Sequence, residues 1–167
     1  MTTTAGATHL PPLGRHVYEE VGNELQATLV ELLDLSLVGK QLHWCLVGEL
    51  FRPLHLYLDE LVGSWHELSD TVAERAVAVG SWPDGQASAV AAASLRRPLP
   101  RGAVEDHVAV LELVTRLAQV SERTRARMDR LGELDAASQD VLVQLVRTLE
   151  KQLWMLRVQL RHRGDRP

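Results

Sequence analysis

Apolar side chains recur along most of this chain at intervals of three and four residues. In the stretch 15–44 they fall at Val21, Leu25, Leu29 and Leu32, among others. Because successive residues of an α-helix are rotated by about 100°, this spacing collects the apolar side chains on one face. The pattern therefore predicts an amphipathic helix over 15–44, with its polar face turned to solvent.

Three further helices are expected from the same periodicity. Pro53 suits the first turn of the second helix, where its missing N–H costs no hydrogen bond, and the pattern continues to about Val79. A third helix is expected over about 104–131. Asp135 is a good N-cap for a fourth helix, whose leucines are spaced by three and four residues as far as Leu160.

The connection 80–102 joins the second and third long helices and is interrupted by glycine and proline, while its alanine-rich part, 86–95, predicts a short helix. The sequence shows no strand-like alternation. Two long helices, a long crossover and two more long helices predict an all-α fold, a ferritin-like four-helix bundle. We expect the bundle to span 15–163, with a flexible N-terminal tail over 1–14 and a short C-terminal tail over 164–167.

Composition narrows the class of protein. The 167 residues are 46% hydrophobic and carry a formal net charge of -4, which suits one globular domain and argues against nucleic-acid binding by its body. The longest stretches free of charge are too interrupted or too polar to span a membrane. The N-terminal residues lack the features of a secretory signal, and the single cysteine, Cys45, fits a reducing cytoplasm.

Candidate metal ligands lie on the second predicted helix in two pairs. His55 and Asp59 are four residues apart, as are Asp70 and Glu74, so each pair shares one helix face. Eleven residues separate Asp59 from Asp70, which returns to nearly the same face about 16 Å further along the helix. One metal ion therefore cannot contact both pairs on one straight helix. A single pair of this kind is usually part of a solvated face, but two pairs on one stripe indicate a divided site.

The two pairs would meet if two copies of this helix packed antiparallel across a twofold axis. The midpoint of the four residues falls between Ser64 and Trp65, and Gly63 and Ser64 are small enough for a close approach. Such an interface is self-complementary, so it would create two equivalent sites. Imidazoles and carboxylates with open coordination positions suit Fe(II) oxidation, whereas oxygen ligands alone would equally suit Mn or Mg.

The candidate ligands belong to a longer pattern: a histidine, a second histidine twelve residues later, and then aspartate, aspartate and glutamate at steps of four, eleven and four. The stretches around them are Lys40-Gln41-Leu42-His43-Trp44, Gly48, Phe51, Leu54-His55, Asp59-Glu60-Leu61, Asp70-Thr71-Val72-Ala73-Glu74-Arg75 and Leu149-Glu150-Lys151-Gln152-Leu153-Trp154-Met155-Leu156. Over about 25–160, this spacing and these stretches resemble the Dps family, the DNA-binding proteins from starved cells.

The resemblance implies a homododecameric shell that oxidises Fe(II), preferably with hydrogen peroxide, stores ferric mineral and so limits oxidative damage. By position, it implies a ferroxidase site that holds two iron ions when loaded. His43, His55 and Asp59 would come from one subunit, and Asp70 and Glu74 from its twofold partner. The alternative function is a nucleoid-associated protein that compacts DNA and has a secondary iron site. A bacterioferritin or conventional ferritin is disfavoured, because the chain contains no Glu-x-x-His motif.

Three residues near these ligands have two interpretations each. His66 lies four residues before Asp70 on the same stripe, so it either extends the metal site or is a supporting or surface histidine. Trp44 follows His43 and is either a radical trap or a packing anchor. Cys45 stands where the family often has asparagine, and it is either a sacrificial reductant or a small, half-buried residue.

The remaining candidates concern iron uptake and DNA. Asp135 and Asp140 could line a threefold pore that admits iron, although a helix cap explains Asp135 equally well. His9 and His16 are weak candidates for a second metal site. The first fourteen residues contain no lysine or arginine, so contact with DNA would depend on the last four arginines. These are Arg157, Arg161, Arg163 and Arg166. One such tail would bind weakly and in a salt-sensitive way, and useful affinity would need many copies of the tail on one shell. We expect a cytoplasmic protein, associated with the nucleoid only if this contact forms.

Overall fold

The computed structural model describes residues 10–11, 13–94, 98–99 and 101–161, and this part of the chain is almost entirely helical. The helices are α1 (Arg15–Cys45), α2 (Phe51–Ala78), α3 (Ala87–Ala93), α4 (Asp106–Gly132) and α5 (Ala136–Arg161). The predicted all-α four-helix bundle, with a short helix in its long connection, is therefore confirmed. The stretches 1–9 and 164–167 of the predicted tails lie outside the described residues.

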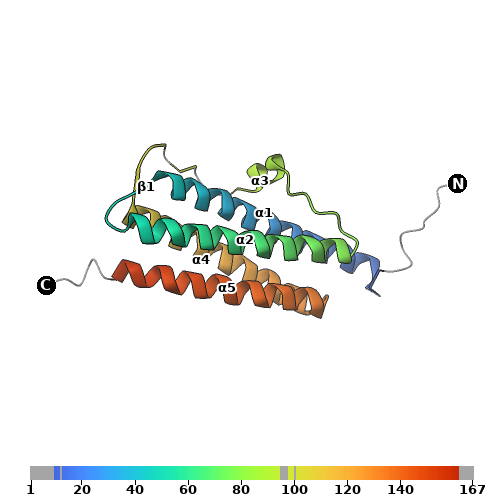
Figure 1. The fold of residues 1–167 in the computed structure, drawn as a ribbon. Helices are drawn as coiled ribbons and strands as arrows, with labels where there is room; N and C mark the ends of the chain where they lie inside the picture. The colour runs from blue at the N-terminus through green and yellow to red at the C-terminus, as the bar shows by residue number, and fades with distance from the viewer. Residues whose placement is uncertain (1–9, 12, 95–97, 100, 162–167) are drawn as a thin grey trace.

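Two antiparallel hairpins make up the bundle: α1 with α2, and α4 with α5 (Figure 1). α2 ends at the opposite end of the bundle from the start of α4, so the connection between them runs along the length of the molecule and carries α3 over α1. This crossover brings α4 against α1 and α5 against α2. The four long helices thereby enclose one core.

The core consists mainly of leucine and valine, and Trp65 on α2 is its largest fully buried side chain. Its indole N–H donates to Oε1 of Gln152 on α5 over 2.9 Å, and the Gln152 amide in turn donates to Ser64 over 3.1 Å. A Cβ atom at Gly39 of α1 would lie 2.8 Å from the Trp65 ring. Glycine at this position thus allows α1 to pass close over α2.

A small parallel sheet joins β1 (Leu46–Val47) to β2 (Val104–Glu105), with Leu46 opposite Val104. The sequence predicted no strand here and started the third long helix at 104. That helix, α4, instead starts at Asp106, because the two residues before it pair with the segment that follows α1. Strands of two residues are too short to leave a periodic signal in the sequence.

The turn between α1 and α2 is anchored by Asp106, which is almost fully buried. Its carboxylate accepts a hydrogen bond of 2.9 Å from the backbone N–H of Leu50. Gly48 lies against that carboxylate with a φ of 122°, and a Cβ atom there would come within 2.6 Å of the Asp106 oxygen. Glycine is therefore required both by the backbone conformation and by the available space. This anchor fixes how the end of α1 faces the start of α2.

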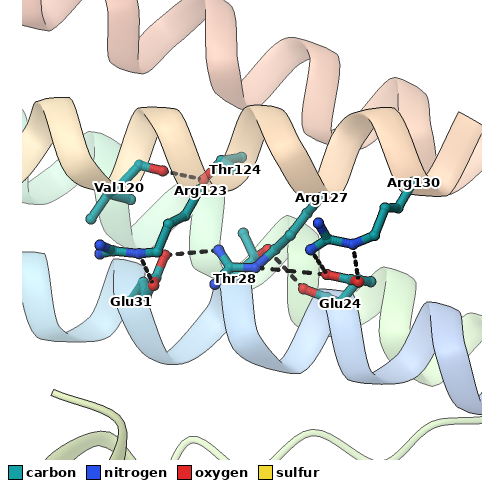
Figure 2. Close-up of polar contacts among 8 residues, drawn as sticks. All are labelled: Glu24, Thr28, Glu31, Val120, Arg123, Thr124, Arg127 and Arg130. Atoms are coloured by element: carbon teal, nitrogen blue, oxygen red, sulfur yellow. Dashed lines mark hydrogen bonds and ion pairs between the residues drawn. The ribbon is translucent and has the colours of Figure 1, made fainter. Parts of the chain in front are cut away.

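Acidic residues of α1 and arginines of α4 form a ladder of ion pairs between these two helices (Figure 2). Glu24 accepts two hydrogen bonds from Arg130, of 2.6 and 2.9 Å, and Glu31 accepts bonds from Arg123 and Arg127. The Glu31 and Arg127 side chains are about nine-tenths buried. We call these five residues the α1–α4 ladder. Its charges are paired within the chain.

Residues 10–14, which the sequence assigned to a flexible tail, contact the bundle where the structure describes them. Leu10 lies over Gly80 at the end of α2, and the Tyr18 hydroxyl donates to the carbonyl of Pro11. Leu13 packs against the core. Among the described helices, none has the length and apolarity needed to cross a membrane.

Candidate functional site

Two histidines from facing ends of α1 and α2 form the centre of the candidate site. The rings of His43 and His55 stack with their centroids 3.6 Å apart and their planes at 21°. Nδ1 of His43 lies 3.0 Å from the carbonyl oxygen of His55, and Nδ1 of His55 lies 3.0 Å from the carbonyl oxygen of His43. Each ring is thus oriented by the backbone of the other helix.

These reciprocal contacts determine the chemistry of both rings. A carbonyl oxygen can only accept a hydrogen bond, so each Nδ1 carries the proton and donates it. The other ring nitrogen, Nε2, then keeps its lone pair in the neutral imidazole. A histidine whose second nitrogen donates to a carbonyl is the usual arrangement of a metal-binding imidazole. His43 and His55 are therefore both prepared to offer Nε2 to a metal ion.

Asp59 brings a carboxylate to the same place from one turn further along α2. Its Oδ1 lies 3.4 Å from Nδ1 of His43 and 2.6 Å from the ammonium nitrogen of Lys40 on α1. The hydrogen bond from Lys40, opposed by partial burial and assisted by the nearby histidines, holds the pKa of Asp59 below its usual range. Asp59 is thus a carboxylate at neutral pH. We call His43, His55 and Asp59 the α1–α2 half-site.

Asp70 and Glu74 do not join the half-site within this chain. Both lie on the exposed face of α2, and neither has an ion-pair or hydrogen-bond partner in the part of the chain that the structure describes. α2 is continuous from Phe51 to Ala78, so the predicted separation of about 16 Å between Asp59 and Asp70 holds. Within the described residues, no three acidic, histidine or cysteine side chains form a group able to hold a metal ion.

The face that carries these residues also exposes large apolar side chains. Leu37 and Trp44 are 62% and 69% exposed, and they flank Lys40 on one stripe of α1. On α2, a Cβ atom added at Gly63 would meet nothing within 4 Å, and His66 is exposed beside it. Trp44, which adjoins His43, is therefore mostly uncovered by its own chain.

The two predicted pore residues have different surroundings. Asp135 caps α5, because its Oδ2 accepts the backbone N–H of Ser138 over 3.1 Å, and it also pairs with Arg75 of α2 over 2.6 Å. Burial raises the pKa of Asp135, but its hydrogen bonds to Ser138 and Arg75 outweigh this and lower it. The capping interpretation thus accounts for Asp135. Asp140 is exposed and stays available for the predicted pore.

The other candidates lie away from the half-site or outside the described residues. Cys45 is half-buried and accepts a hydrogen bond from Gln41 over 3.1 Å. His16 is exposed, whereas His9 lies outside the described residues. Arg157 is exposed and lines a groove of about 790 Å³ between α4 and α5. The side chain of Arg161 and all of Arg163 and Arg166 are not described.

Two features of the site did not follow from the sequence. The reciprocal hydrogen bonds of His43 and His55 depend on how α1 faces α2, which no local pattern reveals. Lys40 belongs to the stretch that carries the family resemblance, but we gave it no role. One signal could have drawn attention to Lys40: lysine is rare in this sequence, since only Lys40 and Lys151 among its 18 lysines and arginines are lysines.

Comparison with known proteins identifies the family of this chain. A family model described as "Ferritin-like domain" matches residues 22–163. The DNA protection during starvation protein of Mycolicibacterium smegmatis is 33% identical over 157 residues, which cover 93% of this chain and 85% of that protein. The DNA protection during starvation protein 2 of Deinococcus radiodurans is 30% identical, over 96% of this chain and 67% of its own length.

The fold matches a solved structure at similar identity. "Mycobacterium smegmatis Dps tetragonal form" superposes with a TM-score of 0.87 at 29% identity, and the match covers 96% of this chain and 94% of that one. The family model and the curated relatives each span most of the sequence, including both halves of the candidate site. The chain therefore belongs to the Dps family of ferritin-like proteins.

Proposed function

We propose that this protein is a Dps-type ferroxidase and iron-storage protein, which oxidises Fe(II) at sites shared between two subunits and stores the product inside a dodecameric shell. The observation that carries the proposal is the α1–α2 half-site. It offers two oriented imidazole Nε2 atoms and one carboxylate from Asp59, and α2 carries a complementary carboxylate pair that its own chain cannot use there.

A second copy of the chain supplies the missing ligands in this proposal. If two α2 helices pack antiparallel about the midpoint between Ser64 and Trp65, residue n of one copy lies opposite residue 129 − n of the other. His55 then faces Glu74 of the second copy, and Asp59 faces its Asp70. The exposed Gly63 at the centre allows the close approach, because it carries no side chain.

Exposed apolar side chains support the burial of this face. Leu37 and Trp44 are both more than 60% exposed in the isolated chain, on either side of Lys40. Large exposed apolar groups rimmed by polar residues are typical of surfaces that a partner covers. A contact that buries them would also shield the carboxylates from water and so strengthen their hold on a cation.

The chain's own residues have distinct parts in the proposed reaction. The His43 and His55 imidazoles hold iron through Nε2 while their Nδ1–H groups stay bonded to backbone carbonyls, so the rings cannot rotate away. The carboxylates of Asp59, Asp70 and Glu74 favour Fe(III) over Fe(II) because they are hard, anionic ligands. Two Fe(II) ions give one electron each to hydrogen peroxide, whose O–O bond breaks, and with two protons the products are two Fe(III) ions and two waters. A paired transfer avoids the release of hydroxyl radicals.

Mixed assembly of two defective variants tests the shared site most directly. One variant carries His55→Ala and Asp59→Asn, and the other carries Asp70→Asn and Glu74→Gln. Alone, each leaves every shared site incomplete. Co-expressed with different tags and purified as mixed shells, they should recover about one quarter of the native sites, because half of the random pairs are mixed and each mixed pair holds one complete site.

The readout is peroxide-driven oxidation of Fe(II), followed by absorbance, with each variant's own shell as the control. Recovery near a quarter of native activity would support a site made from two chains. Mixed shells as inactive as the separate variants, despite native helicity and assembly, would exclude it. Gel filtration of the native protein tests the proposed dodecamer in the same preparation.

The alternative function, compaction of DNA, has one structural observation in its favour. Arg157 is exposed near the end of α5, in the region where the sequence places the other basic residues. Neutralising phosphates through these arginines would give binding that weakens steeply with salt. A gel-shift at low salt should therefore lose its band when the chain is truncated after Leu160. Truncation after Leu160 leaves Arg157 in place, so an identical shift from the truncated protein would remove Arg161, Arg163 and Arg166 from the proposal.

A further inference from the structure

A methionine and a tyrosine meet in a cleft between α2 and α5, outside the α1–α2 half-site. The hydroxyl of Tyr57 donates a hydrogen bond to Sδ of Met155 over 3.8 Å. The cleft has a volume of about 380 Å³, and its other lining residues are Leu50, Pro53, Leu54 and Gln159. Since Met155 is 40% exposed, its thioether lies beside a phenol in mainly apolar surroundings that water and small solutes can enter.

Tyr57 lies on the opposite side of α2 from the candidate ligands. It is two residues after His55 and two before Asp59, and two residues rotate the helix by about 200°. The ligands therefore face the second copy in the proposed arrangement, whereas Tyr57 faces α5. The sulfur of Met155 is thus no ligand of the proposed site, and the proposed twofold contact leaves it uncovered.

Met155 differs in its surroundings from Met128 of α4. The Met128 side chain packs against the core, and Met1 lies outside the described residues. Oxidants reach sulfur atoms according to their exposure, and a sulfoxide turns an apolar side chain into a polar one. At Met128 this would place a polar group among core side chains, which costs stability. At Met155 the added oxygen can extend into the cleft, so the fold tolerates it.

Tyr57 provides the oxidised form of Met155 with a hydrogen-bond partner. A thioether sulfur is a weak acceptor, whereas the phenol O–H is an ordinary donor. The oxygen of a sulfoxide is a much better acceptor, so the same O–H gains a stronger bond once Met155 is oxidised. Negative charge builds up on the transferred oxygen during the reaction. A donor beside the sulfur therefore stabilises the transition state more than the starting thioether.

We propose that Met155 is a sacrificial residue that consumes hydrogen peroxide, and that Tyr57 assists its oxidation as a hydrogen-bond donor. A lone pair of Sδ attacks one peroxide oxygen, the O–O bond breaks, and an S–O bond forms. Sulfur loses two electrons and peroxide gains them, and both peroxide hydrogens leave with the second oxygen as water. This step needs no metal ion, so it goes beyond the proposed iron chemistry. Enzymes that reduce methionine sulfoxide can restore the thioether.

A purely structural contact between these side chains predicts the opposite sign. If Tyr57 only covers the sulfur, removing its hydroxyl opens the sulfur to solvent and speeds its oxidation. If the hydroxyl assists the transfer of oxygen, its removal slows the same reaction. The rate of oxidation at this one methionine therefore distinguishes the two roles.

Peptide mass spectrometry measures this rate. The assembled protein is freed of metal with a chelator and exposed to hydrogen peroxide, and sulfoxide is followed at each methionine over time. We expect Met155 to be oxidised at least about fivefold faster than Met128. Tyr57→Phe removes only the hydroxyl and should slow oxidation of Met155 about three- to tenfold, as expected for the loss of one hydrogen bond. Tyr18→Phe removes a hydroxyl that bonds Pro11 instead, and it should leave the rate unchanged.

The peroxide consumed by the metal-free protein provides a second measurement. Met155→Leu keeps an apolar side chain of similar size without sulfur, and it should lower consumption by one equivalent per chain. Met128→Leu is the matched control and should leave consumption unchanged over the same interval. Cys45 is present in the native protein and in both variants, so any peroxide that its thiol consumes cancels in the comparison.

The outcomes separate this inference from the proposed function. Equal rates at Met155 and Met128, or faster oxidation of Met155 in a Tyr57→Phe protein of native helicity and assembly, would overturn it. Because the measurements are made without metal, a failure of the shared iron site would leave them unaffected. Conversely, Met155→Leu should oxidise iron at the native rate, and a loss of iron oxidation would contradict the separation of the two reactions.

Discussion

The α1–α4 ladder and the α1–α2 half-site both use polar side chains of α1 together with those of a neighbouring helix, but the two clusters differ in how their charges are balanced. In the ladder, Glu24 and Glu31 are both bonded to arginines of α4, and the pair of Glu31 with Arg127 is about nine-tenths buried. On α2, Asp59 is paired with Lys40 of α1, whereas Asp70 and Glu74 have no partner among the described residues.

This difference separates a cluster whose charges are paired within the chain from one whose carboxylates remain available to the ligand proposed above. A carboxylate bonded to arginine within its own chain has no free charge for a metal ion, and breaking such a buried pair costs stability. A carboxylate left exposed on a helix costs little to the fold and remains able to bind a cation. Substitutions in the ladder should therefore affect stability alone, and substitutions in the half-site should affect iron chemistry alone.

The largest effect on stability should come from Glu31→Ala. This change leaves Arg123 and Arg127 without their shared carboxylate between α1 and α4, and we expect a loss of about 3 kcal/mol in the free energy of unfolding. Urea denaturation followed by circular dichroism measures it. The rate of iron oxidation per folded shell should stay native. A loss of less than about 1 kcal/mol would mean that the ladder is not the structural cluster that its burial suggests.

The converse substitution, Asp70→Asn with Glu74→Gln, should slow peroxide-driven iron oxidation by about 100-fold, because it removes two of the three carboxylates of the proposed site. The urea midpoint should stay within error of the native value, since neither side chain has a partner in the described structure. Glu67→Gln, also exposed on α2, serves as the control for adding an amide to this helix. Native oxidation by the double variant would refute the assignment of these carboxylates.

Asp135 sharpens the comparison, because it lies near Glu74 but is bonded to an arginine, as the acidic residues of the ladder are. Asp135 caps α5 and pairs with Arg75, the neighbour of Glu74. Asp135→Asn should lower the free energy of unfolding by about 1–2 kcal/mol near neutral pH. A carboxyl whose pKa is lowered by folding contributes stability above its unfolded-state pKa and loses it as pH falls through the folded-state pKa.

The pH dependence gives this prediction its sign. The pKa of Asp135 is lowered in the folded protein, so the difference in stability between native and Asp135→Asn should be constant near neutrality and shrink below the ordinary range for aspartate. Urea midpoints measured from neutral pH down into that acidic range test it. A difference that persists at the acidic end would show that the asparagine is destabilising for reasons other than charge.

The sequence was sufficient to predict the long helices and the spacing of the candidate ligands, for one physical reason. Both are periodic within a single helix, so the leucines of α5 and the pairs of His55 with Asp59 and Asp70 with Glu74 are visible in one chain segment. The argument that the two pairs cannot share a metal ion within one chain also needs only the rise of one helix.

The sequence pattern did not predict which side chains contact one another between helices. Glu31 and Arg127 are 96 residues apart, and Lys40 and Asp59 are 19 apart, so their pairing depends on how separate helices pack. The strands β1 and β2 have two residues each and show no alternation. Asp135 was predicted correctly as a cap because capping is local, whereas its ion pair with Arg75 was not foreseen.

The smallest expected effect concerns His66, which shares the exposed stripe of α2 with Asp70 and Glu74 but has no assigned role. In the antiparallel arrangement proposed above, His66 lies opposite Gly63 of the second copy, which carries no side chain. Its imidazole would then stand beside the ligands without replacing any of them. His66→Ala should therefore change the iron oxidation rate by about twofold and leave the number of bound metal ions unchanged. His107→Ala, at an exposed position on α4, is the matched control. A lower metal stoichiometry for His66→Ala, with His107→Ala unchanged, would instead make His66 a ligand. The shared site would then bind more metal than His43, His55, Asp59, Asp70 and Glu74 account for.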